Sequence, residues 1–338
     1  MFENRSTLED LPSREPLRRP ATSIPQPAAQ GAAGRGVFEG VGRQPDLRVD
    51  GLRRSFAETV AVDDVTFTLH AGELVGFVGG NGAGKTTTMR MIMGLLSPDA
   101  GQVHWQGRAI TAADRARFGY LPEERGLYPK QRVIDQLVYL GRLHGLSARE
   151  ATDRATALLG RLGLGARTGD KLETLSLGNQ QRVQVIAAVL HSPSMLVLDE
   201  PFSGLDPDAV DAMVGLLREH TSTGVPVLFS SHQLDLVERL CDRVVVLARG
   251  RVVADGTPDQ LRAGATARWR LVVDTDAGWV RDQVGLAVLD VDRGTAIVEP
   301  LTPTAGRELL AAALRRGTVL EYARIVPSLS EIYREVTA

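Results

Sequence analysis

One stretch of ten residues, 79–88, constrains this 338-residue chain more than any other. It reads GGNGAGKTTT and satisfies the pattern GxxxxGK[ST] through Gly79, Gly84, Lys85 and Thr86. Glycines allow backbone conformations that a Cβ atom would forbid, so several N–H groups can point at one anion. The stretch is therefore predicted to be a loop that binds the phosphates of a nucleoside triphosphate.

Two side chains of this loop carry specific chemistry. Lys85 supplies a mobile positive charge for the β and γ phosphates, and the Thr86 hydroxyl is suited to bind Mg²⁺. The sequence thus predicts a nucleoside triphosphate and Mg²⁺ as cofactors. The residues expected to contact the nucleotide here are Gly79, Gly80, Asn81, Gly82, Ala83, Gly84, Lys85, Thr86 and Thr87.

The flanks of the loop support this interpretation. Residues 74–78 are mostly apolar, as in a buried strand, and residues 86–95 place Met89, Ile92 and Met93 on one face of a helix. The helix would direct its partial positive charge at the phosphates. A glycine turn that fits the pattern by chance is the alternative, and the flanking elements disfavour it.

Composition narrows the class of protein. With 43% apolar residues, 24% charged residues and a net charge of -2, the chain is typical of a soluble globular protein with two domains. A broad basic surface for nucleic acid is not expected. The single Cys241 excludes an internal disulfide and fits a reducing cytosol. No apolar run is long enough to span a bilayer, and no signal peptide is apparent.

The N-terminal region has a composition unlike the rest. Residues 1–44 contain five prolines and show no apolar periodicity, so they are expected to be disordered. An internal start site and a tether are both open as explanations.

The remaining segments predict an α/β order. Strands are expected at residues 46–52, 61–69, 101–110 and 118–121, and helices at 133–144 and 147–164. Residues 195–198 are fully apolar and end in Asp199-Glu200-Pro201, as a buried parallel strand would. Another buried strand, 225–229, ends before Ser230-Ser231-His232, and 244–247 with 250–253 form a predicted hairpin. Open α/β sheets bind ligands at such carboxyl ends.

Taken together, these strings resemble the ATP-binding subunit of an ATP-binding cassette (ABC) transporter. The resemblance covers about residues 46–260, and the ATP-binding domain is expected to span residues 45–260. It implies a P-loop NTPase ABC ATPase core of α/β class, with an antiparallel β-subdomain and a helical subdomain at about residues 124–182. Phe56 stands where an aromatic residue stacks on adenine; a core phenylalanine is an equally weighted alternative.

The family signature LSGGQ matches LSLGN at residues 175–179, with Leu177 and Asn179 departing from the pattern. The resemblance implies that Ser176, Gly178 and Asn179 contact the γ phosphate of ATP held by another subunit. Two chains would then enclose two nucleotides, most simply as a homodimer. A helix capped by Ser176 without any ligand role is the alternative.

Further roles follow from the resemblance. Asp199 matches the aspartate that holds Mg²⁺ through water, and Glu200 matches the general base that activates water. His232 matches the switch histidine, and Lys85 completes the catalytic group. Residues 203–206 resemble the D-loop, which links the two sites.

Glu123 departs from the family pattern. Most members carry glutamine there, in the Q-loop that contacts the metal or its water. A carboxylate can still bind a hard cation but adds negative charge beside Asp199 and Glu200. In the family the Q-loop also senses the membrane subunit, and we hypothesise that Glu123 keeps this sensor role.

The C-terminal region, residues 265–338, is expected to be a small α+β accessory domain. It has predicted strands at 268–273 and 287–299, a helix at 303–316 and a final helical LSEIYREV. This order resembles the extension of exporter ATPases in the drug-resistance and sodium-export branch. A regulatory or dimerising role and a simple stabilising cap are both open.

The leading interpretation is an ATP-hydrolysing subunit that energises an exporter through nucleotide-driven dimerisation. The resemblance implies separate transmembrane permease subunits as partners and a cytoplasmic position, peripheral on the inner face of the membrane. No nucleic acid partner is expected. The alternatives are a soluble ABC-type ATPase acting on ribosomes or nucleic acid, which the near-neutral charge disfavours, and a small-molecule kinase, which the signature disfavours.

Overall fold

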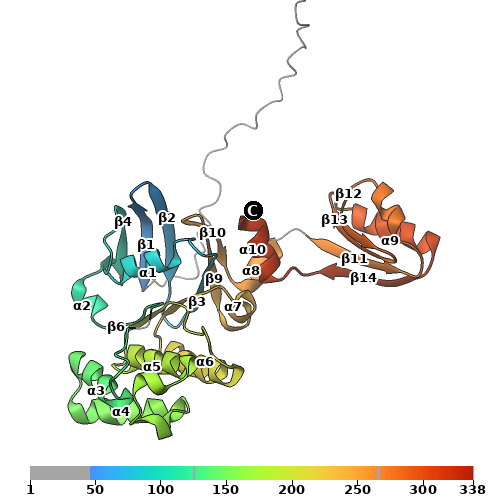
Figure 1. Ribbon diagram of the computed structural model, residues 1–338. Helices are drawn as coiled ribbons and strands as arrows, with labels where there is room; N and C mark the ends of the chain where they lie inside the picture. The colour runs from blue at the N-terminus through green and yellow to red at the C-terminus, as the bar shows by residue number, and fades with distance from the viewer. Residues whose placement is uncertain (1–45, 125, 265–266, 338) are drawn as a thin grey trace, which may run out of the picture. The chain divides into compact units, whose positions relative to one another are not determined.

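The computed structural model describes residues 46–124, 126–264 and 267–337 (Figure 1). The expectation of disorder at residues 1–44 lies outside the described residues. In the described part of the chain, the central sheet has six strands in the order β10-β9-β3-β8-β7-β6. Their bounds are Leu74–Gly79 (β3), Phe118–Leu121 (β6), Met195–Leu198 (β7), Val227–Ser231 (β8), Arg243–Ala248 (β9) and Arg251–Gly256 (β10). All run parallel except the edge strand β10.

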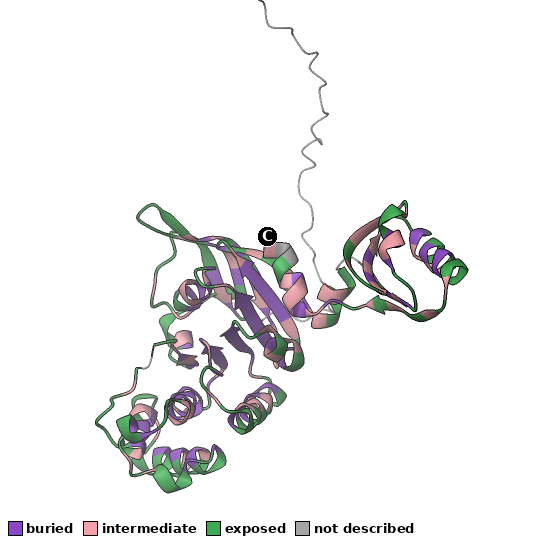
Figure 2. Cartoon of the chain, turned by 45° about the vertical axis from the view of Figure 1, so that its right-hand side comes forward, coloured by how far each residue is buried: buried purple, intermediate pink, exposed green. Residues whose placement is uncertain are grey.

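The two faces of the central sheet bury different sets of side chains. Along β3, Leu74 and Val78 join one apolar cluster, and Val75 and Phe77 join another. Successive strand residues point to opposite faces, so a fully apolar strand must be covered on both sides. Figure 2 shows the central strands of this sheet in the colour of buried residues. The run of apolar residues before the phosphate loop therefore predicts its central place in the fold.

An antiparallel sheet in the order β2-β1-β4-β5 shares the second cluster with helix α1. Its strands and this helix are Leu47–Phe56 (β1), Thr59–Leu69 (β2), Ala100–Trp105 (β4), Arg108–Ala109 (β5) and Lys85–Ile92 (α1). Trp105 is 1% exposed and packs edge-on against Phe118. This sheet thus closes one face of the core.

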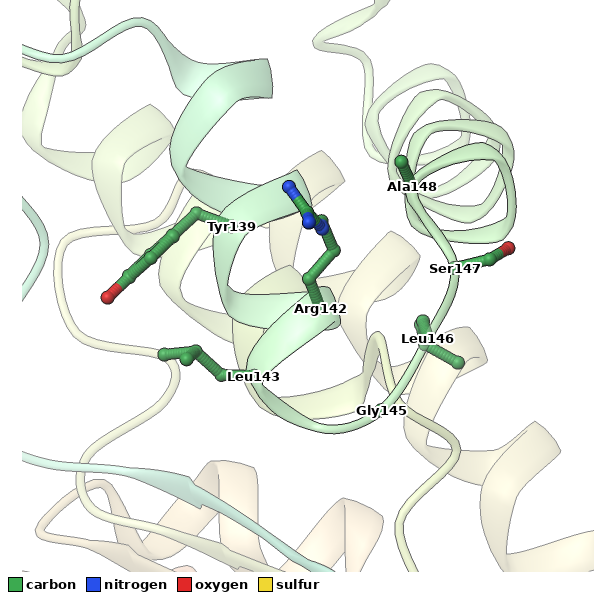
Figure 3. A pocket seen from close by; sticks show the side chains of 7 residues that line it. All are labelled: Tyr139, Arg142, Leu143, Gly145, Leu146, Ser147 and Ala148. Atoms are coloured by element: carbon green, nitrogen blue, oxygen red, sulfur yellow. The ribbon is translucent and has the colours of Figure 1, made fainter.

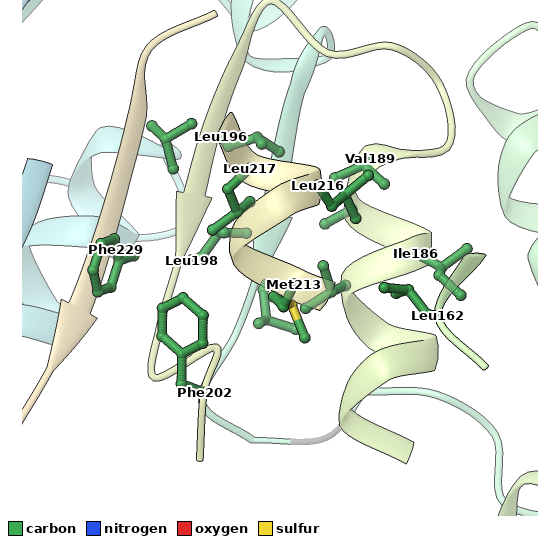
Figure 4. Close-up of a cluster of buried hydrophobic side chains, with 14 of the residues drawn as sticks. Leu162, Ile186, Val189, Leu196, Leu198, Phe202, Met213, Leu216, Leu217 and Phe229 are labelled. Atoms are coloured by element: carbon green, nitrogen blue, oxygen red, sulfur yellow. The ribbon is translucent and has the colours of Figure 1, made fainter. Parts of the chain in front are cut away.

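Helices cover the other face. Those with side chains in or against the cluster of Leu74 and Val78 are Val133–Leu143 (α3), Ala148–Arg161 (α4), Leu177–Val189 (α5), Pro207–Ser222 (α6), Leu234–Leu240 (α7) and Pro258–Gly264 (α8). The remaining helix of this part, Ala112–Arg115 (α2), is a single turn beyond β5. Ile186 of α5 and Met213 of α6 pack in one cluster with Leu198 of β7 (Figure 4). Because α5 contacts β6 as well as α3 and α4, it joins the helical segment to the sheet.

The C-terminal strands form a sheet of their own in the order β12-β13-β11-β14. The elements here are Arg268–Val273 (β11), Leu286–Asp292 (β12), Thr295–Pro300 (β13), Ala305–Arg316 (α9), Val319–Ile325 (β14) and Leu329–Thr337 (α10). Leu309 and Ala313 of α9 are buried with Leu271 of β11 and Val298 of β13. This helix therefore covers one face of an antiparallel sheet.

Together these elements confirm the predicted fold class, a P-loop α/β core with an antiparallel sheet, a helical segment and a small C-terminal α+β unit. Two strand predictions were wrong in detail. Residues 101–110 form the hairpin β4–β5, because Gln106 and Gly107 turn the chain with φ of 48° and 79°. Residues 287–299 likewise divide into β12 and β13, and β14 was not predicted. In the described part of the chain, no helix has the length and apolar character needed to cross a membrane.

Candidate functional site

The phosphate loop connects the end of β3 to the start of α1, as its sequence predicts. Gly84 has a φ of 101°, and a Cβ atom there would lie 2.5 Å from the carbonyl oxygen of Ala61. Only glycine fits this position. Ala83 N donates to Gly80 O at 3.1 Å, which closes the turn of the loop, while Asn81 and Gly82 are exposed. The loop is therefore preformed with its tip open to solvent.

Lys85 lies over the inside of this loop. Its ammonium donates to the carbonyl oxygens of Gly79 at 2.6 Å and Gly80 at 3.2 Å, and the residue is 8% exposed. A buried ammonium needs such partners. Its charge is thus held beside the backbone N–H groups that would bind phosphate.

The topology brings the other candidate residues to the same edge of the sheet. Strands β3, β8 and β7 are neighbours and parallel, so their carboxyl ends lie side by side. Lys85 follows β3, Asp199 follows β7 and His232 follows β8. Residues that are far apart in sequence are therefore gathered around the phosphate loop.

Asp199 is 1% exposed and is held on one side only. Its Oδ1 accepts a hydrogen bond from Ser230 Oγ at 2.5 Å, whereas Oδ2 is buried and has no hydrogen-bond partner among the described residues. A buried oxygen without a partner is costly unless a cation or water completes it. This oxygen fits a Mg²⁺ ion or a water of its shell.

Two further oxygens suit a hard cation. Thr86 Oγ1 donates to Glu123 Oε2 at 3.3 Å, which places the Q-loop carboxylate beside the phosphate loop. Burial raises the pKa of the Tyr120 phenol, and the negative charges of Asp199 and, to a smaller extent, Glu123 raise it too, against the opposing effect of Arg90. In the described part of the chain, no group of three or more His, Cys, Asp or Glu residues forms a metal cluster by itself.

Glu200 is fixed from three directions. Its N–H donates to Ser230 Oγ at 2.8 Å, its carbonyl oxygen accepts from Gln181 Nε2 at 3.2 Å, and its Oε2 lies 3.0 Å from His232 Nδ1. Its φ of 50° is unusual for a residue with a Cβ atom. Such strain persists where the surroundings hold the residue, and it is concentrated at functional sites.

The signature segment begins α5. Ser176 is the N-cap residue, and its Oγ accepts from Asn179 N at 3.4 Å. A Cβ atom on Gly178 would lie 2.7 Å from the carbonyl oxygen of Gly204, so the signature packs tightly on residues 203–206. Leu177, which replaces a glycine of the family pattern, is 61% exposed and leaves this packing intact.

Comparison with known proteins agrees with this arrangement. The family model described as ABC transporter matches residues 62–203. The ABC transporter ATP-binding protein YhaQ of Bacillus subtilis (strain 168) is 37% identical over 290 residues, which is 86% of this chain and 97% of that protein. The chain belongs to the ATP-binding subunits of ABC transporters. This family hydrolyses ATP.

Other relatives of this ABC ATP-binding subunit carry more specific names. The Nod factor export ATP-binding protein I of Ralstonia nicotianae is 37% identical over 66% of this chain and 70% of its own length. The linearmycin resistance ATP-binding protein LnrL of Bacillus subtilis (strain 168) is 35% identical over 64% and 70%. A solved ATP-binding subunit of an ABC transporter is 36% identical, covers 65% of this chain and 95% of its own, and has a TM-score of 0.60.

The C-terminal part of this ABC subunit matches a second family model. It is described as the C-terminal domain of DrrA1-3-like ATP-binding proteins and covers residues 256–337. The match supports the predicted resemblance to the drug-resistance branch.

Phe56 lies at the end of β1 and is 47% exposed, with the guanidinium of Arg54 5.1 Å from the ring centroid. The alternative of a core phenylalanine is therefore wrong, and stacking on adenine stays a prediction.

Sequence reasoning missed two supporting residues of this ABC site. Ser230 connects Asp199 to the backbone of Glu200, and Gln181 holds the carbonyls of Glu200 and Pro201. Gln181 is 6% exposed, and buried polar residues next to sequence motifs are the signal that points to such roles. These two residues hold the backbone of Glu200.

Proposed function

We propose that this chain energises an ABC exporter by nucleotide-driven dimerisation, coupled to separate transmembrane subunits. The observation that carries the catalytic part is the 3.0 Å contact between His232 Nδ1 and Glu200 Oε2 beside the phosphate loop. A carboxylate oriented by an imidazole suits a base that activates water. The other Glu200 anchors keep this carboxylate in place.

Each residue of the site has a proposed role. Gly79 to Thr87 bind the phosphates of ATP, Phe56 stacks on adenine, and Lys85 neutralises charge on the β and γ phosphates. Thr86 and Asp199, with Glu123, would hold Mg²⁺, which when bound neutralises charge that develops on the phosphates. Glu200 accepts the proton of the attacking water, and His232 orients Glu200.

The second chain completes the site in this proposal. Ser176, Gly178 and Asn179 stand at the N-terminus of the 13-residue helix α5, where backbone N–H groups lack helical partners. They would bind the γ phosphate of ATP held by the opposite copy. A symmetric dimer would then contain two such sites.

The membrane partners are proposed to dock on the helical segment and the Glu123 loop. An open hollow of about 480 Å³ at the end of α3 is lined by Tyr139, Arg142 and Leu143 and by the turn into α4 (Figure 3). Tyr139 and Leu143 are 54% and 64% exposed. Exposed apolar side chains around a hollow are typical of protein interfaces. The subunit would thus lie in the cytoplasm, at the inner face of the membrane.

Export is proposed as the direction of transport, supported by the relatives named for Nod factor export and linearmycin resistance. The proposed division of the chain is a cassette at 45–260, with its helical subdomain at about 124–182, and an accessory domain at 265–338. The separate C-terminal core around Leu271 and Leu309 supports this division.

The test is Glu200→Gln in the full chain. We expect ATP binding to remain and ATP turnover to fall by about 10² to 10⁴, because only the positioned base is lost. Sedimentation should show an ATP-dependent dimer that persists. Glu308→Gln on the exposed face of α9 is the matched control and should hydrolyse ATP normally. Full turnover by Glu200→Gln, or a monomer at saturating ATP, would contradict the proposal.

A further inference from the structure

The C-terminal helix α10 packs on the cassette rather than on the C-terminal sheet. It contacts α7, α8 and β10, and Leu329 is 1% exposed within the large apolar cluster (Figure 1). Leu329 N donates to Glu238 Oε2 at 2.9 Å, and Glu238 also pairs with Arg262 of α8. The start of α10 is therefore fixed to α7, which begins two residues after His232.

A capping box fixes the same end. Ser328 N donates to Glu331 Oε2 at 2.8 Å, and Glu331 N donates back to Ser328 Oγ at 3.3 Å. These bonds from Ser328 also lower the pKa of Glu331. Reciprocal bonds of this kind set where a helix begins and in which direction it points. The side chains of the first helical turns are thus well placed.

Tyr333 follows Leu329 by four residues and so lies on the same face of α10. It is partly buried against the large cluster. A Cβ atom on Gly80 would lie 3.1 Å from Tyr333 Oη, which is closer than ordinary van der Waals contact. Gly80 is also the residue whose carbonyl accepts from Lys85.

We propose that Tyr333 is a positioning residue for ATP: its hydroxyl braces the turn at Gly80 and thereby the ammonium of Lys85. This inference rests on the assignment of the loop as the ATP site. The brace acts on binding of the phosphates, since Tyr333 has no place in proton transfer. The C-terminal extension is therefore a working part of the nucleotide site, anchored on the helix that follows His232.

The test compares Tyr333→Phe, Gly80→Ala and the double variant in the full chain, with KM and kcat for ATP measured separately. Tyr333→Phe should raise KM about threefold and leave kcat within about twofold, because only one hydroxyl is lost. In Gly80→Ala the new methyl group presses on the hydroxyl and should also raise KM. In the double variant the methyl group has room. Its increase in KM should therefore be at least about twofold smaller than the product of the two single-variant increases.

Tyr322→Phe is the matched control, because Tyr322 donates to Gly306 O and stacks on Trp269 within the C-terminal unit. Its KM should equal that of the parent chain. The proposal would be overturned by an unchanged KM in Tyr333→Phe, or by increases in KM that simply multiply in the double variant. In either case Lys85→Ala should still lose ATP binding, because the site assignment would be unaffected. Retained ATP binding by Lys85→Ala would overturn the site assignment itself.

Discussion

The phosphate loop and the signature segment are both expected to bind ATP, yet the chain supports them differently. The loop follows a strand in which every residue is buried, and its Lys85 is 8% exposed with two carbonyl partners. The signature starts a helix at the surface, where Leu177 is 61% exposed and Ser176 caps Asn179 at 3.4 Å. One half of the site is thus complete within the chain, and the other half presents donors outward. This difference favours a site shared between two copies.

The largest effect on ATP turnover is expected from a substitution in the phosphate loop. Lys85→Ala removes the positive charge that Lys85 holds at the phosphate loop, so ATP turnover should fall by about 100-fold or more and ATP affinity should fall with it. ATPase assays and equilibrium binding measure the two losses. Lys130→Ala, at an exposed lysine, is the control. If Lys85→Ala bound ATP normally, the contrast between the halves would lose its basis.

The signature half should respond through packing. Gly178→Ala places a methyl group 2.7 Å from Gly204 O, so turnover should fall by about tenfold to 100-fold while ATP affinity of the isolated chain stays near normal. Gly160→Ala is the control, because nothing lies within 4 Å of the Cβ position there. Equal loss of affinity in Gly178→Ala and Lys85→Ala would break the comparison.

A mixture of the two defective variants, Lys85→Ala and Gly178→Ala, tests directly whether the ATP site is shared between two copies. A dimer of Lys85→Ala with Gly178→Ala contains one intact phosphate loop facing one intact signature. The equimolar mixture should recover up to about a quarter of the parent ATPase activity if sites act independently. Activity no higher than the average of the two variants would contradict a shared site.

A smaller effect is expected behind the phosphate loop. Ser230→Ala leaves the buried Asp199 Oδ1 without its donor and the partly buried Glu200 N without its acceptor. Turnover should fall by about tenfold with little change in the free energy of ATP binding, because the strained carboxylate is less well placed. The turnover rate measured in ATPase assays at saturating ATP tests this prediction. Ser222→Ala, at an exposed serine, should behave like the parent.

The smallest effect concerns the far end of α5. His191 stacks on His144 with ring centroids 3.8 Å apart, and burial, together with the neighbouring His144, lowers the pKa of His191 from 6.5 to about 4. Below pH 6.5 the unfolded chain therefore binds more protons at this residue, so stability falls as the pH drops from 6.5 toward 4. When the pH falls from 7.5 to 5, the Tm of His191→Gln should therefore drop by about 2 °C less than the Tm of the parent chain. An identical pH dependence of Tm would refute this.

The fold was predictable where burial is strong. The strand at residues 195–198 has the predicted bounds because every residue is apolar and both faces are covered. The edge strand β14 was missed because Val319–Ile325 is only partly buried and mixes charged with apolar residues. The turn at Gln106 and Gly107 was missed because residues 101–110 read as one continuous strand. Weak periodicity at edges and turns leaves the sequence ambiguous.

The candidate site likewise has a part that could be predicted from the sequence and a part that could not. Lys85, Asp199, Glu200 and His232 follow buried strands, so their meeting at one edge of the sheet could be predicted. The bonds of Ser230 and Gln181 could not, because they depend on side-chain rotamers across separate elements. The approach of Tyr333 to Gly80 depends on the packing of α10, which follows a strand that the sequence did not predict.

Helix α5 carries the signature at its start and Gln181 just over one turn later. Gln181 Nε2 donates to the carbonyls of Glu200 and Pro201 at 3.2 Å each. A rotation of this helix must either break both bonds or twist the backbone at Glu200 and Pro201. In the proposed dimer, the binding of ATP from one copy at the signature of the other would therefore be coupled to the position of Glu200 in that other copy.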